Sequence, residues 1–292
     1  MAEFEVLLQV LFWGLYAGCI YILLATGLNI IFGVMKVVNF AHGEFLMVGA
    51  YITATVFFLT GINPYAIILL SMLVLIGIGA VVERLCFRPM LGTSKLNEIF
   101  LSIGLIYIFT NSAAIIWGDE WQSIKSPYAG ITIPVGSLNV PFDYIIIMVV
   151  TAAILCALYL FLKKTKTGRE MRATSQNRKG AMLVGINVER MDILSFGIGC
   201  ALAAAAGTLW VVSGQVFNPY MGSIPAVKAF AIIILGGLGS IPGAIIGGLL
   251  YGIAENGAAY YFGGIWKDAV SFIILIIVLV IRPTGLFGES GE

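Results

Sequence analysis

The run VLLQVLFWGLYAGCIYILLATGLNIIFGVM occupies residues 6–35 and contains no charged side chain. About 20 apolar residues are enough to cross a bilayer as an α-helix, so this run alone predicts a membrane span. Five further uncharged runs are also long enough to cross, at residues 45–82, 99–118, 144–162, 193–227 and 229–254. The sequence therefore predicts an all-α protein that crosses the membrane several times.

The composition supports the same class. Of the 292 residues, 60% are hydrophobic and only 11% are charged, whereas about a quarter of the residues are charged in soluble domains. A soluble fold of this length could not bury so much apolar surface. A soluble enzyme, a nucleic-acid-binding protein and a disordered scaffold are therefore excluded, and the lipid bilayer is the expected surrounding of the chain.

The charged residues predict the orientation of the spans. Residues 163–192 contain eight basic and three acidic residues, a net charge of +5. Because short basic loops stay on the cytoplasmic side, we place this segment inside. The loop 83–98 is basic as well, while 119–143 carries three acids and one lysine. These loops alternate in sign as inner and outer loops should, which puts the start of the first span outside.

The turn signals divide the apolar runs into about eight membrane segments. Gly61-Ile62-Asn63-Pro64 predicts an outer turn between spans 45–60 and 65–82. Residues 213–228 predict an outer or re-entrant stretch, and GGLGSIPG at 236–243 predicts a broken helix, because proline removes a helical hydrogen bond. Simple counting puts the C-terminus outside, whereas Arg282 after the last span favours the inside. We expect one transmembrane domain over residues 1–292, with a cytoplasmic loop at 163–192.

Glycines recur at helical spacing. Gly14 and Gly18 are four residues apart, as are Gly248 and Gly252. Small residues four apart share one helix face and let two backbones approach closely. The pattern indicates either tight packing within this subunit or a helix interface with a second membrane subunit.

Polar side chains interrupt the stretch GLNIIFGVMKVVNFAHGEFLMVGAY at 27–51. A charge at the bilayer centre costs about 2.5–3.5 kcal/mol on insertion scales, so these groups must lie near an interface, line a wet cavity or pair with one another. Gly27, Gly33 and Gly43 favour an interrupted helix, and such helices commonly build substrate sites in membranes. The alternative is an inner-face loop whose polar groups only cap helices, and Glu255 raises the same question.

The basic loop contains a predicted surface helix from Arg169 to Val184, with Thr167 as a possible N-cap and Gly185 as its stop. Such a helix is either a solvated topology signal or a docking element.

Motifs for chemistry are absent from the sequence. It has no GxxxxGK[ST] loop for ATP, no HExxH for zinc and no GxSxG elbow. His42 is the single histidine, so a catalytic pair with serine or cysteine is not expected. We expect no catalytic residue, cofactor or metal on this chain. An ATPase-independent solute channel and an intramembrane enzyme remain as alternatives.

Four blocks carry a family resemblance. Residues 27–51 resemble the signature of permease subunits of branched-chain amino acid ABC importers, the LivH type. The resemblance continues through GREMRATSQNRKGAMLVGI at 168–186, through NPYMGSIPAVKAFAIIILGGLGSIPGAIIGGLLYGIAE at 218–255, and through RPTGLFG at 282–288. RATSQNRKGA is also similar to the branch that imports urea and short amides, whereas the block at 218–255 favours the amino acid branch.

The resemblance implies a multi-pass subunit of the prokaryotic cytoplasmic membrane. A second, LivM-like permease, two cytosolic ATPase subunits that use ATP and Mg, and an extracytoplasmic substrate-binding protein would complete the importer. In such importers a cytoplasmic helix of the permease docks on the ATPase, and residues 169–186 are its counterpart here. The implied docking residues are Arg169, Glu170, Arg172, Ala173, Asn177, Ala181 and Gly185. The candidates for the translocation path or its gate are Asn29, Asn39, His42, Glu44, Gly236, Gly237, Gly239, Pro242, Gly243 and Glu255.

Overall fold

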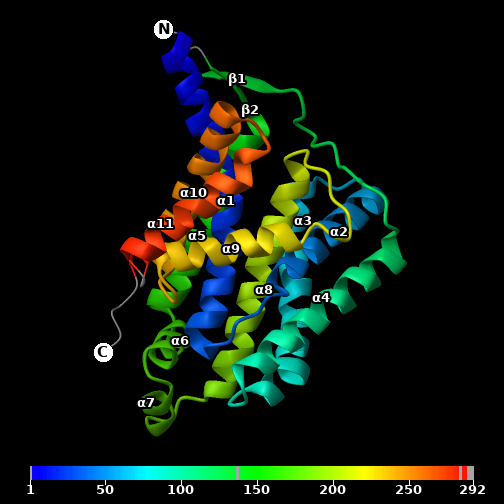
Figure 1. Cartoon of the computed structure of the whole chain (residues 1–292). Helices are drawn as coiled ribbons and strands as arrows, with labels where there is room; N and C mark the ends of the chain where they lie inside the picture. The colour runs from blue at the N-terminus through cyan, green and yellow to red at the C-terminus, as the bar shows by residue number, and fades with distance from the viewer. Residues whose placement is uncertain (1, 136–137, 283–284, 288–292) are drawn as a thin grey trace.

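The computed structural model describes residues 2–135, 138–282 and 285–287, so the block at 282–288 lies outside the described residues at positions 283, 284 and 288. The described chain is helical except for one antiparallel hairpin in the loop before α5 (Figure 1). Its elements are α1 (Ala2–Met35), α2 (His42–Thr60), α3 (Pro64–Val82), the π-helix η1 (Glu83–Phe87), the 3-10 helix η2 (Arg88–Met90), α4 (Lys95–Trp117), β1 (Thr132–Val135), β2 (Leu138–Pro141), α5 (Phe142–Lys164), α6 (Lys166–Gln176), α7 (Arg178–Leu183), α8 (Val188–Val212), α9 (Ser223–Gly236), α10 (Ile241–Phe262) and α11 (Trp266–Ile281).

Six helices of the described chain are long and apolar enough to cross a membrane, namely α1, α2, α3 with its continuation to Met90, α4, α5 and α8. The pair α9 and α10 passes the same test together, although it is bent by 118° at the break between them. The prediction of a polytopic helical bundle with a broken segment is confirmed.

The centre of the bundle is formed by α1 and α8. In the most apolar window of each helix, 94% of α1 and 89% of α8 is buried, against 22% in α4 and α5. The Ala- and Gly-rich sequence of α8 allows this, because a Cβ on Gly207 would collide with the backbone of α2 at Leu46. α3, α4 and α5 therefore turn most of their apolar surface outward, where a bilayer can cover it.

The spaced glycines bring α1 and α10 together. A Cβ added to Gly252 would lie 2.5 Å from the carbonyl oxygen of Gly14 and 2.5 Å from the nitrogen of Gly18. A Cβ on Gly248 would lie 2.5 Å from the side chain of Ile22. These four glycines, at 14, 18, 248 and 252, thus pack two helices of one subunit, which is the first of the two alternatives.

The expected interruption of the first helix lies elsewhere. α1 continues through Gly27 and Gly33 to Met35, and the break is the segment 36–41, which opens with Lys36 at a left-handed φ of 58°. Gly27 serves close approach instead, since a Cβ there would lie 2.6 Å from the carbonyl oxygen of Gly199 on α8. The start of α2 lies beside α1, where Nε2 of His42 is 3.2 Å from the carbonyl oxygen of Leu24.

A re-entrant arrangement follows α8. Residues 213–222 are tied to the outer loop by hydrogen bonds between the backbones of Gln122 and Phe217, and then reach the first turn of α2 at Gly43. α9 lies across the bundle and α10 leaves at a steep angle to it (Figure 1). The nitrogens of Leu286 and Phe287 donate to the last carbonyls of α9, and Phe287 lines a cavity together with Arg172 of the basic segment. This contact favours an inner position for residues 285–287, as the charge of Arg282 suggested.

Candidate docking and translocation site

The basic loops meet at one end of the bundle, beyond the C-terminal end of α1 (Figure 1). The Arg88 guanidinium lies 3.3 Å from the Glu189 carboxylate, which joins the loop 83–98 to the start of α8. The Lys95 ammonium donates to the carbonyl oxygen of Lys36 at 2.7 Å. Both loops that charge placed inside are therefore neighbours at the same end.

The predicted docking helix is two short helices. Thr165 caps α6 by accepting a hydrogen bond from the nitrogen of Gly168 at 3.0 Å, and Asn177 caps α7 by accepting from Gly180 at 2.8 Å. The prediction of Thr167 as the N-cap is wrong, because the chain leaves its extended conformation two residues earlier. Gly185 follows α7 at a left-handed φ of 82°, as expected of the stop.

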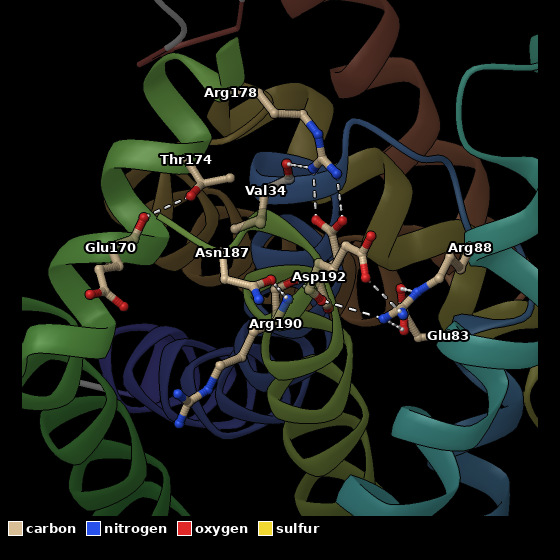
Figure 2. Close-up of polar contacts among 11 residues, drawn as sticks. Val34, Glu83, Arg88, Glu170, Thr174, Arg178, Asn187, Arg190 and Asp192 are labelled. Atoms are coloured by element: carbon tan, nitrogen blue, oxygen red, sulfur yellow. Dashed lines mark hydrogen bonds and ion pairs between the residues drawn. The ribbon is translucent and has the colours of Figure 1, made fainter. Parts of the chain in front are cut away.

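An ion pair anchors α7 to α8. The Arg178 guanidinium donates to both carboxylate oxygens of Asp192, at 2.7 and 2.5 Å, and it reaches the carbonyl oxygen of Val34 at 3.5 Å (Figure 2). Asp192 is almost completely buried, whereas a third of the Arg178 side chain is exposed. The hydrogen bond to Asp192 raises the pKa of Arg178, so this arginine stays charged. One guanidinium thus joins α7, α8 and the end of α1.

A second contact anchors α6. The Arg172 guanidinium donates from Nε to the carbonyl oxygen of Leu162 on α5 at 3.1 Å, and Met171 is buried between α6 and the bundle. The close approach of Gly168 to the backbone at Leu162 leaves no room for a Cβ. The docking segment, residues 165–187, is therefore fastened to the transmembrane helices at both of its helices.

A cavity of about 710 Å³ lies between the docking segment and the helix break. Arg172 of α6 lines it on one side, and Gly239 and Pro242 of the break line it on another. Asn29 of α1 also lines the cavity and binds the break, because its amide nitrogen donates to the carbonyl oxygen of Ser240 at 2.7 Å and its amide oxygen accepts from the nitrogen of Gly239 at 2.6 Å. One side chain thus satisfies two backbone groups of the break, the nitrogen of Gly239 and the carbonyl oxygen of Ser240.

The remaining polar candidates of the first half hold the start of α2. Asn39 accepts a hydrogen bond from the nitrogen of Ala41 at 3.0 Å, and Thr110 of α4 donates to Glu44 at 3.3 Å. Asn39, Glu44 and His42 are completely or nearly completely buried, and they are absent from the described lining of the cavity. These contacts place Asn39, His42 and Glu44 at the start of α2, away from the inner cavity, and their role in the path stays a prediction.

The other candidates are distributed over the second half. Gly236 and Gly243 face one another so closely that neither could carry a Cβ, and Gly237 ends α9 at a φ of 104°. Glu255 is buried in α10 beside Lys228 of α9, at 2.6 Å. The structure therefore collects Asn29, Gly239 and Pro242 at one cavity, and leaves Glu255 outside its described lining.

Comparison with known proteins assigns the fold and the family. The family model described as the branched-chain amino acid transport system / permease component matches residues 10–279. The chain belongs to this family. The permease protein BraD of Pseudomonas aeruginosa is 36% identical over 99% of this chain and 98% of its own length, and LivH of Escherichia coli is 34% identical over 98% and 97%. The structure of PsaBC from Streptococcus pneumoniae in complex with Fab shares the fold, with a TM-score of 0.53, 15% identity and 98% coverage of both chains.

The permease exposes part of the implied docking surface. Arg169, Arg172, Asn177 and Gly185 are exposed, Glu170 and Ala173 are half-buried, and Ala181 is buried. Sequence reasoning missed the apolar end of α7, where Leu183 is 88% exposed and Val184 is 76% exposed. An apolar pair next to a glycine stop in an otherwise basic loop is a signal that could have identified it. Sequence reasoning also missed Arg178 and Asp192, whose pairing depends on the fold.

Proposed function

We propose that this chain is the transmembrane permease subunit of an ATP-driven importer of branched-chain amino acids in the prokaryotic cytoplasmic membrane. The observation that carries the proposal is the similarity of 34–36% over nearly the whole length to permeases named for high-affinity branched-chain amino acid transport. A second related permease would form the path together with this chain, and an extracytoplasmic binding protein would deliver the substrate.

Energy for transport would come from two separate ATPase subunits, since the sequence has no GxxxxGK[ST] loop. ATP and Mg would be bound by those subunits, and this chain would bind no cofactor. The exposed end of α7, at Leu183 and Val184, and the exposed Arg169 on α6 offer apolar and basic contacts for an ATPase. Leu183 is an exposed aliphatic side chain that a cleft on a partner could bury as an anchor.

The coupling step follows from how the docking segment is attached. ATP binding would draw the two ATPases together and move the docked segment. Arg178 would transmit this movement to α8 and to the end of α1, and Arg172 would transmit it to α5. Because Asn29 of α1 holds the break between α9 and α10, a tilt of α1 would also move the wall of the inner cavity. The path would open and close by rigid-body motion of fastened helices.

The test is reconstitution. The permease is purified from native membranes in mild detergent, the proteins that accompany it are identified, and the complex is placed in liposomes with its binding protein. We expect a second permease and two ATPases, and ATP-dependent accumulation of labelled leucine, isoleucine and valine. Accumulation of urea or a short amide in place of leucine would assign the related branch. Uptake by the isolated chain without ATP would indicate a channel.

A further inference from the structure

A second cavity, of about 310 Å³, is lined by the first half of α1, the starts of α5 and α11, and the ends of α8 and α10, so it lies away from the docking segment. Trp13 and Tyr16 of α1, Tyr144 in the first turn of α5 and Trp210 in the last turn of α8 contribute its aromatic wall. Each of these positions lies at or toward the helix end that the loop charges predict to be outer. This outer cavity shares no described lining residue with the inner cavity.

The aromatic wall is preorganised. The rings of Tyr16 and Tyr144 are stacked with centroids 3.9 Å apart and planes 4° apart, which fixes α5 against α1. Trp13 and Trp210 complete an apolar surface with two large rings. Aromatic rings offer broad apolar contact for an aliphatic side chain, and their faces also attract cations.

The opposite wall is polar and charged. Lys267 of α11 lines the cavity, and its ammonium lies 3.1 Å from the buried carboxylate of Glu255. The Lys267 side chain remains 40% exposed, whereas the Glu255 side chain is fully buried. Asn256 also lines the cavity, and its amide nitrogen donates to the carbonyl oxygen of Gly252. Its amide oxygen is the atom that can accept a hydrogen bond from a ligand.

Glu255 is the centre of a charge cluster that holds Lys267 in place. The Lys228 ammonium of α9 lies 2.6 Å from Glu255 and 2.8 Å from Asp268, and the Tyr21 hydroxyl donates to Glu255 at 3.1 Å. The two carboxylates and the two ammonium groups balance in charge. Charged groups at membrane depth are costly and generally mark functional sites. Lys267 is the ammonium of this cluster that lines the aromatic cavity, and its pair with Glu255 fixes its position there.

We propose that the outer cavity is a transient binding site for a zwitterionic α-amino acid with an aliphatic side chain. Lys267 would bind the carboxylate. The aliphatic side chain would lie against the rings of Trp13 and Trp210, and the ammonium group of the ligand would donate to the amide oxygen of Asn256. The volume is at the small end of the range for ligand pockets, which suits a single amino acid. The proposal rests on the function proposed above, and adds a site on the permease itself to that of the binding protein.

The test measures binding to the purified importer without its binding protein. L-leucine is titrated while tryptophan fluorescence and bound labelled leucine are recorded, and leucinamide, which lacks the carboxylate, is titrated in parallel. We expect saturable binding of leucine and about tenfold weaker binding of leucinamide, because a charge-assisted hydrogen bond is lost. Lys267→Gln should weaken leucine binding about tenfold and abolish the preference for leucine over leucinamide.

Two further variants separate binding from folding. Lys267→Arg keeps the charge and should keep leucine binding within about threefold, given that the pair with Glu255 is retained. Lys125→Gln removes an exposed lysine of the outer loop and should bind leucine as the unchanged protein does. A Lys267→Gln variant that assembles with its partners but retains the leucine preference would overturn the proposal. So would the lack of leucine binding in a preparation that takes up leucine with its binding protein. A preparation that imports urea and not leucine would instead refute the function proposed above, and the amino acid site with it.

Discussion

The ion pair between Arg178 and Asp192 should be needed to couple the docking segment to the bundle. In the variant Arg178→Ala, the buried carboxylate of Asp192 loses two charge-assisted hydrogen bonds, and α7 loses its contacts with α8 and with the carbonyl oxygen of Val34. Because Asp192 is only 1% exposed, its carboxylate is left buried without the guanidinium.

The magnitude follows from the burial of the pair. Removal of one partner of a fully buried ion pair destabilises by about 3–5 kcal/mol. A third of the Arg178 side chain is exposed, so water can enter where the guanidinium was, and we expect the lower value of about 3 kcal/mol. Since 1.4 kcal/mol is a tenfold change in an equilibrium, the balance between anchored and released α7 should shift by more than about 100-fold.

The assay follows coupling and anchoring separately. In the reconstituted importer, Arg178→Ala should reduce leucine uptake at least tenfold while basal ATP hydrolysis persists, and trypsin should cleave the docking segment faster. The matched control is Lys179→Ala, which removes the neighbouring exposed cation of the same helix and should leave uptake unchanged. The double variant Arg178→Met with Asp192→Leu should restore resistance to trypsin, because it removes the buried unpaired charge. Equal uptake and equal cleavage in the two single variants would refute the anchoring role.

Three other changes test the docking surface, the helix break and the packing of α10. Leu183→Asp puts a charge on the most exposed apolar side chain of α7, so it should reduce recovery of the ATPases on co-purification at least tenfold while the permease stays in the membrane. Undiminished recovery of the ATPases would contradict a docking role. Asn29→Leu removes the two hydrogen bonds to the break, worth about 1–3 kcal/mol together, and should lower both thermal stability in detergent and leucine uptake. Unchanged stability and uptake would show that these hydrogen bonds do not stabilise the break. Gly252→Leu should prevent stable assembly, since a Cβ at this position would lie 2.5 Å from the α1 backbone, whereas Gly257→Ala places its methyl group in open space on the same helix and should be tolerated. Equal yields of the two variants would refute the close contact between α1 and α10.

The membrane segments could be predicted from the sequence because the bilayer imposes a length. Uncharged runs such as 6–35 and 193–212 correspond to α1 and α8, and the turn at Gly61 and Asn63 lies between α2 and α3 as expected. The proline and glycines of 236–243 predicted the break, because proline removes a helical hydrogen bond and glycine lowers helix propensity whatever surrounds them. These conclusions use local chemistry only.

The candidate site was less predictable because glycine and polar side chains serve several structural purposes. Gly27 and Gly33 suggested a broken helix, yet α1 runs through both, since a neighbouring helix lies where a Cβ would be at Gly27. His42, Asn39 and Glu44 suggested a polar path, and the structure adds that their contacts lie at the start of α2. The helix that a polar side chain faces cannot be predicted from a single sequence, because it depends on how the helices pack.

The sequence by itself determined the membrane environment, the helical class, the basic loops and the broken helix, because each depends on composition or on spacing along the chain. Only the tertiary structure decided that Asn29 clamps a break more than 200 residues away at Ser240, and that Arg178 pairs with Asp192. It also decided that Lys267 stands at the edge of an aromatic cavity, held by Glu255. These contacts join distant helices, and their partners are chosen by packing, which no local pattern encodes.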